Sequence, residues 1–165
     1  MILRYPIAED VQELIARIRP EDRAEVRNIA HLTPDQAVPQ SIAVSDACWA
    51  MRVEFGPLLC IFGVSPVGVT RQGVQVASIW MLGTDAIDRH RQAFWRECGP
   101  GLARCMDALP GVQVFSNLIE TGNGRSRRWL TRLGAAFGRP TTLQDGLAVQ
   151  PFTFTRKEPA PCAAP

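Results

Sequence analysis

The stretch of the chain with the clearest chemical potential is NGRSRRWLTRLGAAFG, residues 123–138. Asn123 and Ser126 are predicted to form a turn-and-cap pair, because short polar side chains satisfy free amides at the start of a helix. Three arginines follow at i, i+3 and i+7, a spacing that aligns them along one side of the helix: Arg125, Arg128 and Arg132. Such a row is most often a solvated stripe. The alternatives are binding to the phosphates of a small ligand, to DNA or to an acidic partner surface.

Another side of the same helix is apolar. Trp129, Leu133 and Ala136 share one face, and this predicts that they pack on the core. We therefore expect Trp129 to anchor the helix on a sheet. The helix is expected to end at Gly138-Arg139-Pro140, where glycine and proline interrupt the pattern.

Two carboxylates are candidates for a general base. Glu54 and Glu120 lie in predicted strands, and either could relay a proton through water if those strands flank a cleft. Ser116 and Asn117, in the same predicted strand as Glu120, could hydrogen-bond a carbonyl group or another part of a substrate. Single carboxylates in strands usually face solvent, so these residues are candidates by position only.

Metal chemistry is not indicated. The five cysteines are scattered and form no C-x-x-C motif, and the two histidines are His31 and His90. This pattern predicts neither a metal site nor a disulfide framework.

Composition indicates one globular domain. The chain has 165 residues, of which 46% are hydrophobic and 21% charged. We assign the domain to residues 1–157 and expect the Pro/Ala-rich tail, residues 158–165, to be disordered.

No apolar run approaches the roughly 18–20 residues of a membrane span, and no signal peptide is evident, so we expect a soluble, cytosolic protein. The net charge of +2 is by itself too small to indicate nucleic-acid binding.

Periodicity predicts the order of the elements. Helices are expected over 8–18, 20–30 and 33–46, followed by an antiparallel meander of strands at 48–55, 58–67 and 73–82. A helix should then run from about Asp85 to Leu109 and be kinked or split at 99–101. A strand at 111–120, the arginine-rich helix and a strand at 148–156 complete the order, with a weaker strand near 141–144.

This order resembles that of the GNAT acyltransferase superfamily. Proteins of that superfamily often carry, after the fifth strand, an asparagine, a small residue three positions later and a basic-Leu-Gly-Phe ending. Asn123, Ser126 and Arg132-Leu133-Gly134 fit this pattern, and Ala135 stands where phenylalanine is usual. The resemblance implies a single α/β domain of α+β type, with a mixed, mostly antiparallel sheet flanked by helices.

A narrower resemblance covers most of the chain. SIWMLGTDAI, residues 78–87, and SNLIETGNGRSRRWLTRLGA, residues 116–135, are similar to segments of the GNAT-type internal virion protein A of short-tailed phages. This implies a phage gene whose product is a virion protein or an assembly protein. It would then lie in the host cytoplasm or the virion, with other virion proteins as partners.

The GNAT resemblance also implies a cofactor site for acetyl-CoA or another acyl-CoA. The expected cofactor-binding residues are those around the end of the third long strand and the start of the last helix: Trp80, Met81, Leu82, Gly83, Thr84, Asn123 and Ser126. Amides of the SIWML strand would stabilise the oxyanion, and the strands at 74–82 and 112–119 should be splayed to admit pantetheine.

Three departures weaken this site. GNAT enzymes bind pyrophosphate with a basic, glycine-rich loop, but here Gly83 is alone, no arginine precedes the helix, and Asp85 would repel phosphate. Thr84 and Asp85 also suit a simple cap. The tyrosine that protonates the leaving thiolate in many GNAT enzymes is replaced by Leu130, and the chain's one tyrosine is Tyr5. Two functions follow: a GNAT-derived phage protein with weak or degenerate acyl-CoA chemistry, or an active acetyl-CoA-dependent N-acyltransferase.

Overall fold

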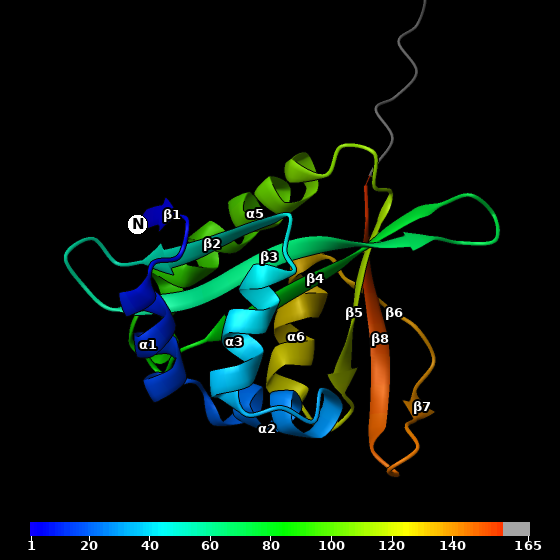
Figure 1. Ribbon diagram of the computed structural model, residues 1–165, viewed down its shortest axis with the longest axis horizontal. Coiled ribbons are helices and arrows are strands. Elements are labelled where there is room, and N and C mark those ends of the chain that lie inside the picture. Colours follow the sequence, from blue (N-terminus) through cyan, green and yellow to red (C-terminus); the bar gives the residue numbers. More distant parts are fainter. Residues whose placement is uncertain (157–165) are drawn as a thin grey trace, which may run out of the picture.

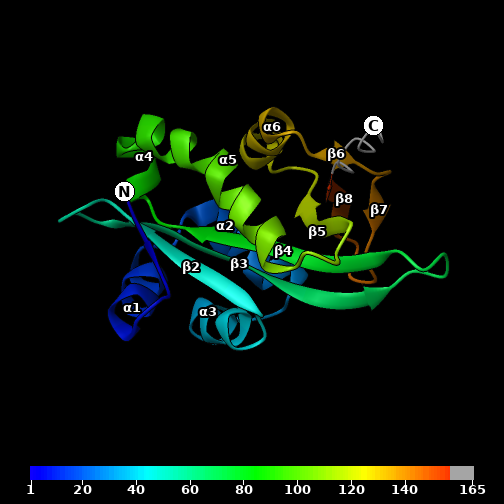
Figure 2. The ribbon, with the colours of Figure 1, turned by 90° about the horizontal axis from the view of Figure 1, so that it is seen from above.

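The computed structural model describes residues 1–156 as one sheet with helices on both faces (Figures 1 and 2). The strands are β1 (Ile2–Arg4), β2 (Ala47–Arg52), β3 (Leu58–Val69), β4 (Gln75–Gly83), β5 (Val114–Glu120), β6 (Ala136–Phe137), β7 (Thr141–Thr142) and β8 (Ala148–Thr155). The helices are α1 (Ala8–Arg17), α2 (Pro20–Ile29), α3 (Pro34–Ala43), α4 (Ala86–Arg89), α5 (Arg91–Ala108) and α6 (Gly124–Leu133).

The sheet has the order β1-β2-β3-β4-β5-β8-β6, and β7 also pairs with β8. The β4–β5 pair is parallel, whereas the other pairs are antiparallel. Helices α1 to α3 cover one face, and α4 to α6 cover the other (Figure 2). The predicted mixed, mostly antiparallel sheet flanked by helices is confirmed.

Local sequence explains the helix starts. Proline occupies the first position of α2 and α3, where a missing backbone N–H costs nothing. In α6, the Asn123 side chain accepts a hydrogen bond from the Ser126 amide at 3.0 Å, which confirms the predicted cap pair. Gly134 ends α6 with a φ of 98°, a conformation that favours glycine.

Several predicted boundaries are wrong. Helix α6 stops at Leu133 rather than near Gly138, and Ala136 is an exposed residue of β6. The break in the central helical region falls at His90, between α4 and α5, while α5 continues through Pro100. The short edge strand β1 was not predicted, because three residues carry too little periodicity.

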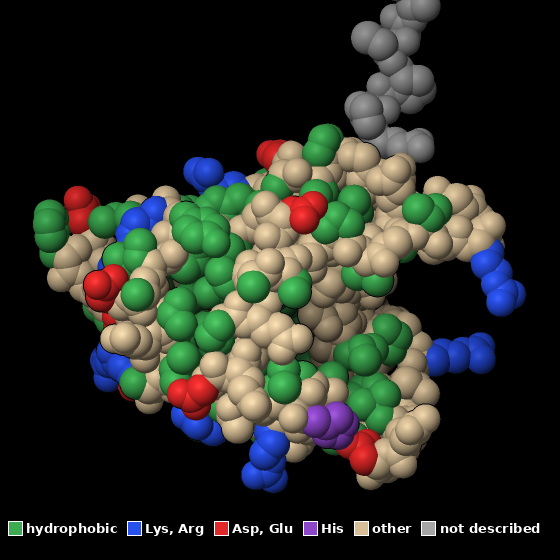
Figure 3. All heavy atoms as spheres, viewed as in Figure 1, with side chains coloured by type: hydrophobic (Ala, Val, Ile, Leu, Met, Phe, Trp, Pro, Cys, Tyr) green, Lys and Arg blue, Asp and Glu red, His purple; other side chains and the backbone are tan. Residues whose placement is uncertain are grey.

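The core has two parts, one on each side of the sheet. Leu14, Val38 and Ile61 belong to the cluster beneath α1 and α3, and Phe94 and Phe115 belong to the larger cluster beneath α5 and α6. On the α1–α3 side of the molecule, acidic and basic side chains are interspersed with apolar ones (Figure 3). Within residues 1–156, no helix combines the length and apolar character needed to cross a membrane. The predicted disordered tail lies outside the described residues.

Candidate functional site

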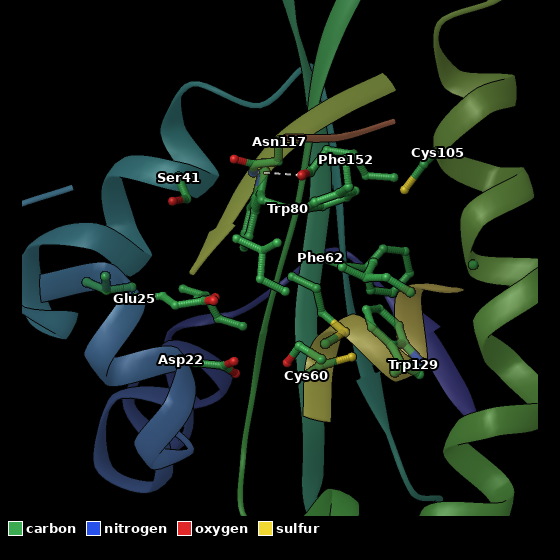
Figure 4. A pocket seen from close by; sticks show the side chains of 18 of the residues that line it. Asp22, Glu25, Ser41, Cys60, Phe62, Trp80, Cys105, Asn117, Trp129 and Phe152 are labelled. Carbon is green, nitrogen blue, oxygen red and sulfur yellow. Dashed lines mark hydrogen bonds between the residues drawn. The ribbon is translucent and has the colours of Figure 1, made fainter. Parts of the chain in front are cut away.

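Strands β4 and β5 form a fork. They pair over three residues of each strand, ending at Ser78 and Ser116, and then diverge. The side chain of Asn117 stands where the next inter-strand bond would form. Its Nδ2 donates to the Ile79 carbonyl at 2.8 Å, and its Oδ1 accepts from the Leu118 amide at 2.7 Å. The Asn117 amide therefore replaces a backbone bond and ends the pairing, as predicted for a splayed gap (Figure 4).

Beyond the fork, β4 has a free edge. The Ile79 carbonyl and the Gly83 amide both point away from β3. Because backbone groups alternate between the two edges of a strand, the N–H and C=O of Met81 point the same way. Strand β5 no longer pairs there, so these two groups face the gap. An extended polar chain could bind them as a pseudo-strand.

A cavity of about 400 Å³ passes through this gap. Its lining joins both helical layers: Glu25 and Ser41 come from the α2–α3 side, and Phe94, Cys98 and Trp129 come from the α5–α6 side. Trp80, Met81 and Leu82 form the β4 wall, and Asn117 forms part of the β5 wall. The fork thus connects the two faces of the sheet (Figure 4).

The end of β4 is closed, in contrast to its middle. The Gly83 amide donates to Asp22 Oδ2 at 2.6 Å, the Thr84 amide to the Leu59 carbonyl at 2.8 Å, and the Asp85 amide to the Arg17 carbonyl at 3.1 Å. The next two amides, of Ala86 and Ile87, donate to the side-chain and backbone oxygens of Thr84. Every amide from Gly83 to Ile87 therefore has a partner in the chain itself.

The residues that close this junction are buried. Asp22 is 3% exposed and pairs with Arg19 through two hydrogen bonds, of 2.8 and 3.0 Å. A Cβ at Gly83 would lie 2.9 Å from Arg19 Nε and 2.6 Å from the Ile87 side chain, so glycine is needed for this close approach. The connection between α1 and α2 thereby packs directly on the end of β4.

Thr84 and Asp85 act as structural residues. Thr84 is fully buried and donates to the Leu58 carbonyl at 2.6 Å. Asp85 forms an ion pair with Arg17 at 2.7 Å. The interpretation of these two residues as structural agrees with their contacts, although the Asp85 side chain makes no cap hydrogen bond.

The two predicted general bases lie in different places. Glu54 is exposed in the turn after β2 and is not part of the cavity lining, so its predicted place in a strand beside the cleft is wrong. The predicted strand 48–55 ends early, at Arg52, where the pairing with β3 is irregular. Glu120 does end β5, and its carboxylate accepts from Asn28 at 2.8 Å.

Glu25 is the acidic residue that sequence reasoning missed. It lines the cavity, and its Oε1 accepts from Asn123 Nδ2 at 3.0 Å and from the Glu120 amide at 3.2 Å. Burial raises the pKa of the Glu25 carboxyl, although these two hydrogen bonds oppose the shift. Its position in α2, remote in sequence from the fork, gave no signal.

Helix α6 presents different residues from those predicted. Leu130, at the position where the GNAT resemblance implies a tyrosine acid, is 4% exposed and lines the cavity. Trp129 is half-buried, stacks on Phe94 of α5 with ring centroids 6.1 Å apart, and donates to Cys98 Sγ at 3.3 Å. Trp129 therefore joins α6 to α5 and faces the cavity, whereas Leu130 is the more deeply buried residue. The predicted shared core face of Trp129, Leu133 and Ala136 is wrong at Ala136.

The arginine row is divided. Arg125 forms ion pairs with Glu21 and Asp88, so it ties α6 to α2 and α4. Arg128 and Arg132 are exposed and form no ion pair within residues 1–156. Whether the row binds a partner stays a prediction.

The cavity thiols are poorly suited to nucleophilic chemistry. Burial raises the pKa of Cys98 to about 11 and that of Cys105 to about 12, and it raises the pKa of Cys60 further. A thiol is reactive as its thiolate, so all three remain protonated and unreactive near neutral pH. Among the residues that the structure describes, no group of His, Cys, Asp and Glu is arranged to hold a metal ion.

Comparisons with known proteins establish the fold. No protein-family model and no curated protein match the sequence. The structure is similar to Ard1 from Thermoplasma volcanium, with a TM-score of 0.67, 12% identity and coverage of 95% of this chain and 98% of that chain. It is also similar to YncA from Salmonella typhimurium, which was solved with its cofactor acetyl-CoA. Here the TM-score is 0.62, the identity is 15%, and the match covers 99% of this chain and 98% of that chain. For the GNAT domain of PAT from S. lividans the TM-score is 0.56, the identity is 15%, and the match covers 92% of this chain and 89% of that chain. The fold is therefore the GNAT fold, as the element order predicted.

Proposed function

We propose that this protein works through binding rather than acyl turnover, and that its cleft does not recognise the pyrophosphate of coenzyme A. The observation that carries the proposal is the use of every amide from Gly83 to Ile87 by the chain itself. Pyrophosphate binds where free amides converge at a helix start. At the start of α4 those donors are occupied, and the nearby carboxylates of Asp22 and Asp85 are held in ion pairs with Arg19 and Arg17. The residues present fit a pantetheine arm along Met81 but do not fit the pyrophosphate.

The proton donor for a leaving thiolate is also missing from the expected place. Leu130 cannot donate, and the neighbouring Cys98 thiol, with a pKa of about 11, is a poor acid. Both features support binding without turnover. We expect acetyl-CoA to bind with a Kd above about 100 μM, a binding free energy weaker than about −5.5 kcal/mol.

Calorimetry with acetyl-CoA and a thiol-release assay with a panel of amines test this function together. We expect weak binding and no release of coenzyme A above the rate without protein. Low-micromolar binding accompanied by amine-dependent release would overturn the proposal.

A second candidate is an active N-acyltransferase, which the open fork and the cavity through the sheet favour. In that function the Met81 N–H would stabilise the developing oxyanion, and Glu25 would accept the proton of the attacking amine. Leu130→Tyr supplies the absent acid. If this candidate is correct, Leu130→Tyr raises turnover and Glu25→Gln lowers it. If binding alone is the function, neither variant shows turnover.

We also propose a role in phage particles or their assembly, on the resemblance of residues 78–87 and 116–135 to internal virion proteins. These segments include Gly83 and Thr84, which close the junction, and Trp129, which joins α6 to α5. Mass spectrometry of gradient-purified particles tests this role. Absence of the protein from particles and from assembly intermediates would contradict it.

A further inference from the structure

The two helical layers carry opposite charge. Helices α4 to α6 contain eight arginines and three acidic residues, whereas α1 to α3 contain three arginines and seven acidic residues. The small net charge of +2 therefore conceals a basic layer on one side of the sheet. This separation is not apparent from overall composition, because it depends on which helices share a face (Figure 2).

The basic layer is largely unneutralised. Asp88, one of its three acids, is already paired with Arg125. Six further arginines of the layer are exposed and have no ion-pair partner within residues 1–156: Arg89, Arg91, Arg96, Arg104, Arg128 and Arg132. On the opposite side, by contrast, Asp10, Glu13 and Asp22 are held in ion pairs with arginines of the same chain.

The positions of these arginines within their helices direct them outward. Helix α5 buries Phe94, Cys98 and Cys105, and Arg96 lies on the opposite side of that helix. Helix α6 buries Leu130, and Arg128 and Arg132 lie on its outer side. Since α5 and α6 are in contact through Phe94 and Trp129, their outer sides form one surface.

An aromatic side chain is exposed on the same surface. Trp95 is 43% exposed, although tryptophan usually buries most of its area. It follows Phe94, whose ring stacks on Trp129 of α6, so Trp95 belongs to the turn of α5 that contacts α6. Arginines around an exposed aromatic ring are the combination that binds single-stranded nucleic acid, through phosphate contacts and base stacking.

We propose that the outer surface of α5 and α6, formed by Trp95, Arg96, Arg128 and Arg132, binds single-stranded nucleic acid without sequence preference. The arginines contact successive phosphates, and the Trp95 indole stacks on one base. Binding at this surface does not depend on the cleft between β4 and β5, which opens beneath these helices. The surface therefore adds an activity to the proposed function instead of restating it.

The test measures the binding of the full chain to a fluorescein-labelled 20-nucleotide oligothymidine and to a 20-base-pair duplex, by anisotropy between 25 and 200 mM NaCl. The triple variant Arg96→Ser/Arg128→Ser/Arg132→Ser should bind the single strand at least about tenfold more weakly. Its slope of log K against log salt should fall by about 2, because three phosphates of a single strand are then no longer neutralised by the protein. Trp95→Ala should lose about fivefold or more on the single strand and almost nothing on the duplex.

A matched control carries the same charge change elsewhere. Arg23→Ser/Arg27→Ser/Arg71→Ser removes three exposed arginines from α2 and from the β3–β4 hairpin, and it should bind within about twofold of the wild type. Equal losses in both triple variants would overturn the proposal, as would no measurable binding at 25 mM NaCl. Tighter binding to the duplex, or equally strong competition by polyglutamate, would also overturn it, the latter in favour of an acidic protein partner.

Discussion

The middle and the end of strand β4 differ in what their backbone leaves available. Around Met81 the edge is free because β5 has diverged, and the cavity passes beside it. From Gly83 onward the amides are satisfied, first by the buried Asp22 carboxylate and then by neighbouring backbone and Thr84. The cleft follows from sheet topology, whereas the closure depends on a few side chains. Under the proposed function, the groove beside Met81 is open while the place for the anionic part of a cofactor is filled.

The largest loss of stability is expected from a substitution at the end of β4, where the backbone amides are bound within the chain. Asp22→Ala leaves the Arg19 guanidinium buried without its partner and removes the acceptor of the Gly83 amide. Loss of one member of a buried pair costs about 3–5 kcal/mol of the free energy of unfolding. Urea denaturation of the wild type and the variant measures this loss in the free energy of unfolding. The double variant Arg19→Met/Asp22→Leu should recover most of the loss, and a single variant within about 1 kcal/mol of the wild type would show that the closure is not structural.

A substitution in the wall of the cavity, at Trp129, should destabilise the protein less. Trp129→Ala removes the stacking on Phe94 and the hydrogen bond to Cys98, and we expect a cost of about 2–3 kcal/mol, below that of a fully buried tryptophan. Trp95→Ala on the exposed side of α5 is the control, expected within about 0.5 kcal/mol. Thermal denaturation of both variants compares them. A cost for Trp129→Ala as small as that of the control would mean that α6 is held by other contacts.

The fork itself can be tested at Asn117. Asn117→Val removes the amide that occupies the inter-strand position, so the Leu118 N–H can donate directly to the Ile79 carbonyl. We expect β4 and β5 to pair one step further and hydrogen exchange at Met81 to slow by about tenfold, with stability changed by about 1 kcal/mol or less. Asn117→Asp keeps the acceptor and loses the donor, and it should not slow exchange. Unchanged exchange in Asn117→Val would indicate that the divergence is set by β4 alone.

The smallest effect concerns Glu25 and depends on pH. Burial raises its pKa in the folded state, so the folded protein holds this proton to higher pH than the unfolded chain does. The resulting stability is fully present below the unfolded pKa of about 4.3 and is lost as pH rises through the folded pKa. Glu25→Gln should therefore gain in melting temperature relative to the wild type between pH 4 and 7. A constant difference across that range would contradict the shift.

The sequence was a good guide to order and a poor guide to long-range contacts. Periodicity predicted the three N-terminal helices, the meander and the last strand, because those patterns are local. It misplaced the end of α6, since Gly134 ends the helix earlier than the second glycine at 138. Glu54 was misplaced because the alternation of apolar and polar residues continues past Arg52, the last residue of β2 that pairs with β3.

The closed junction could be predicted only in part. Asp85 and the single Gly83 predicted a weak phosphate site, and the structure adds that the amides from Gly83 to Ile87 are bound within the chain. The main residue, Asp22, lies 61 positions before the amide that it binds, and α2 shows no pattern that connects it with β4. Glu25, 98 positions before Asn123, was missed for the same reason. Contacts of this kind arise from packing and leave no local signature.

The most direct test of the central claim compares the binding of acetyl-CoA with that of S-acetylpantetheine, which lacks the phosphates and the nucleotide. If the end of β4 is closed to pyrophosphate while the edge at Met81 is open, calorimetry should give the two ligands dissociation constants that agree within about threefold. Both should be weaker than about 100 μM, since neither gains from phosphate contacts. Acetyl-CoA binding more than about thirtyfold tighter than S-acetylpantetheine would contradict the account, because it would require free donors where every amide from Gly83 to Ile87 is already bound.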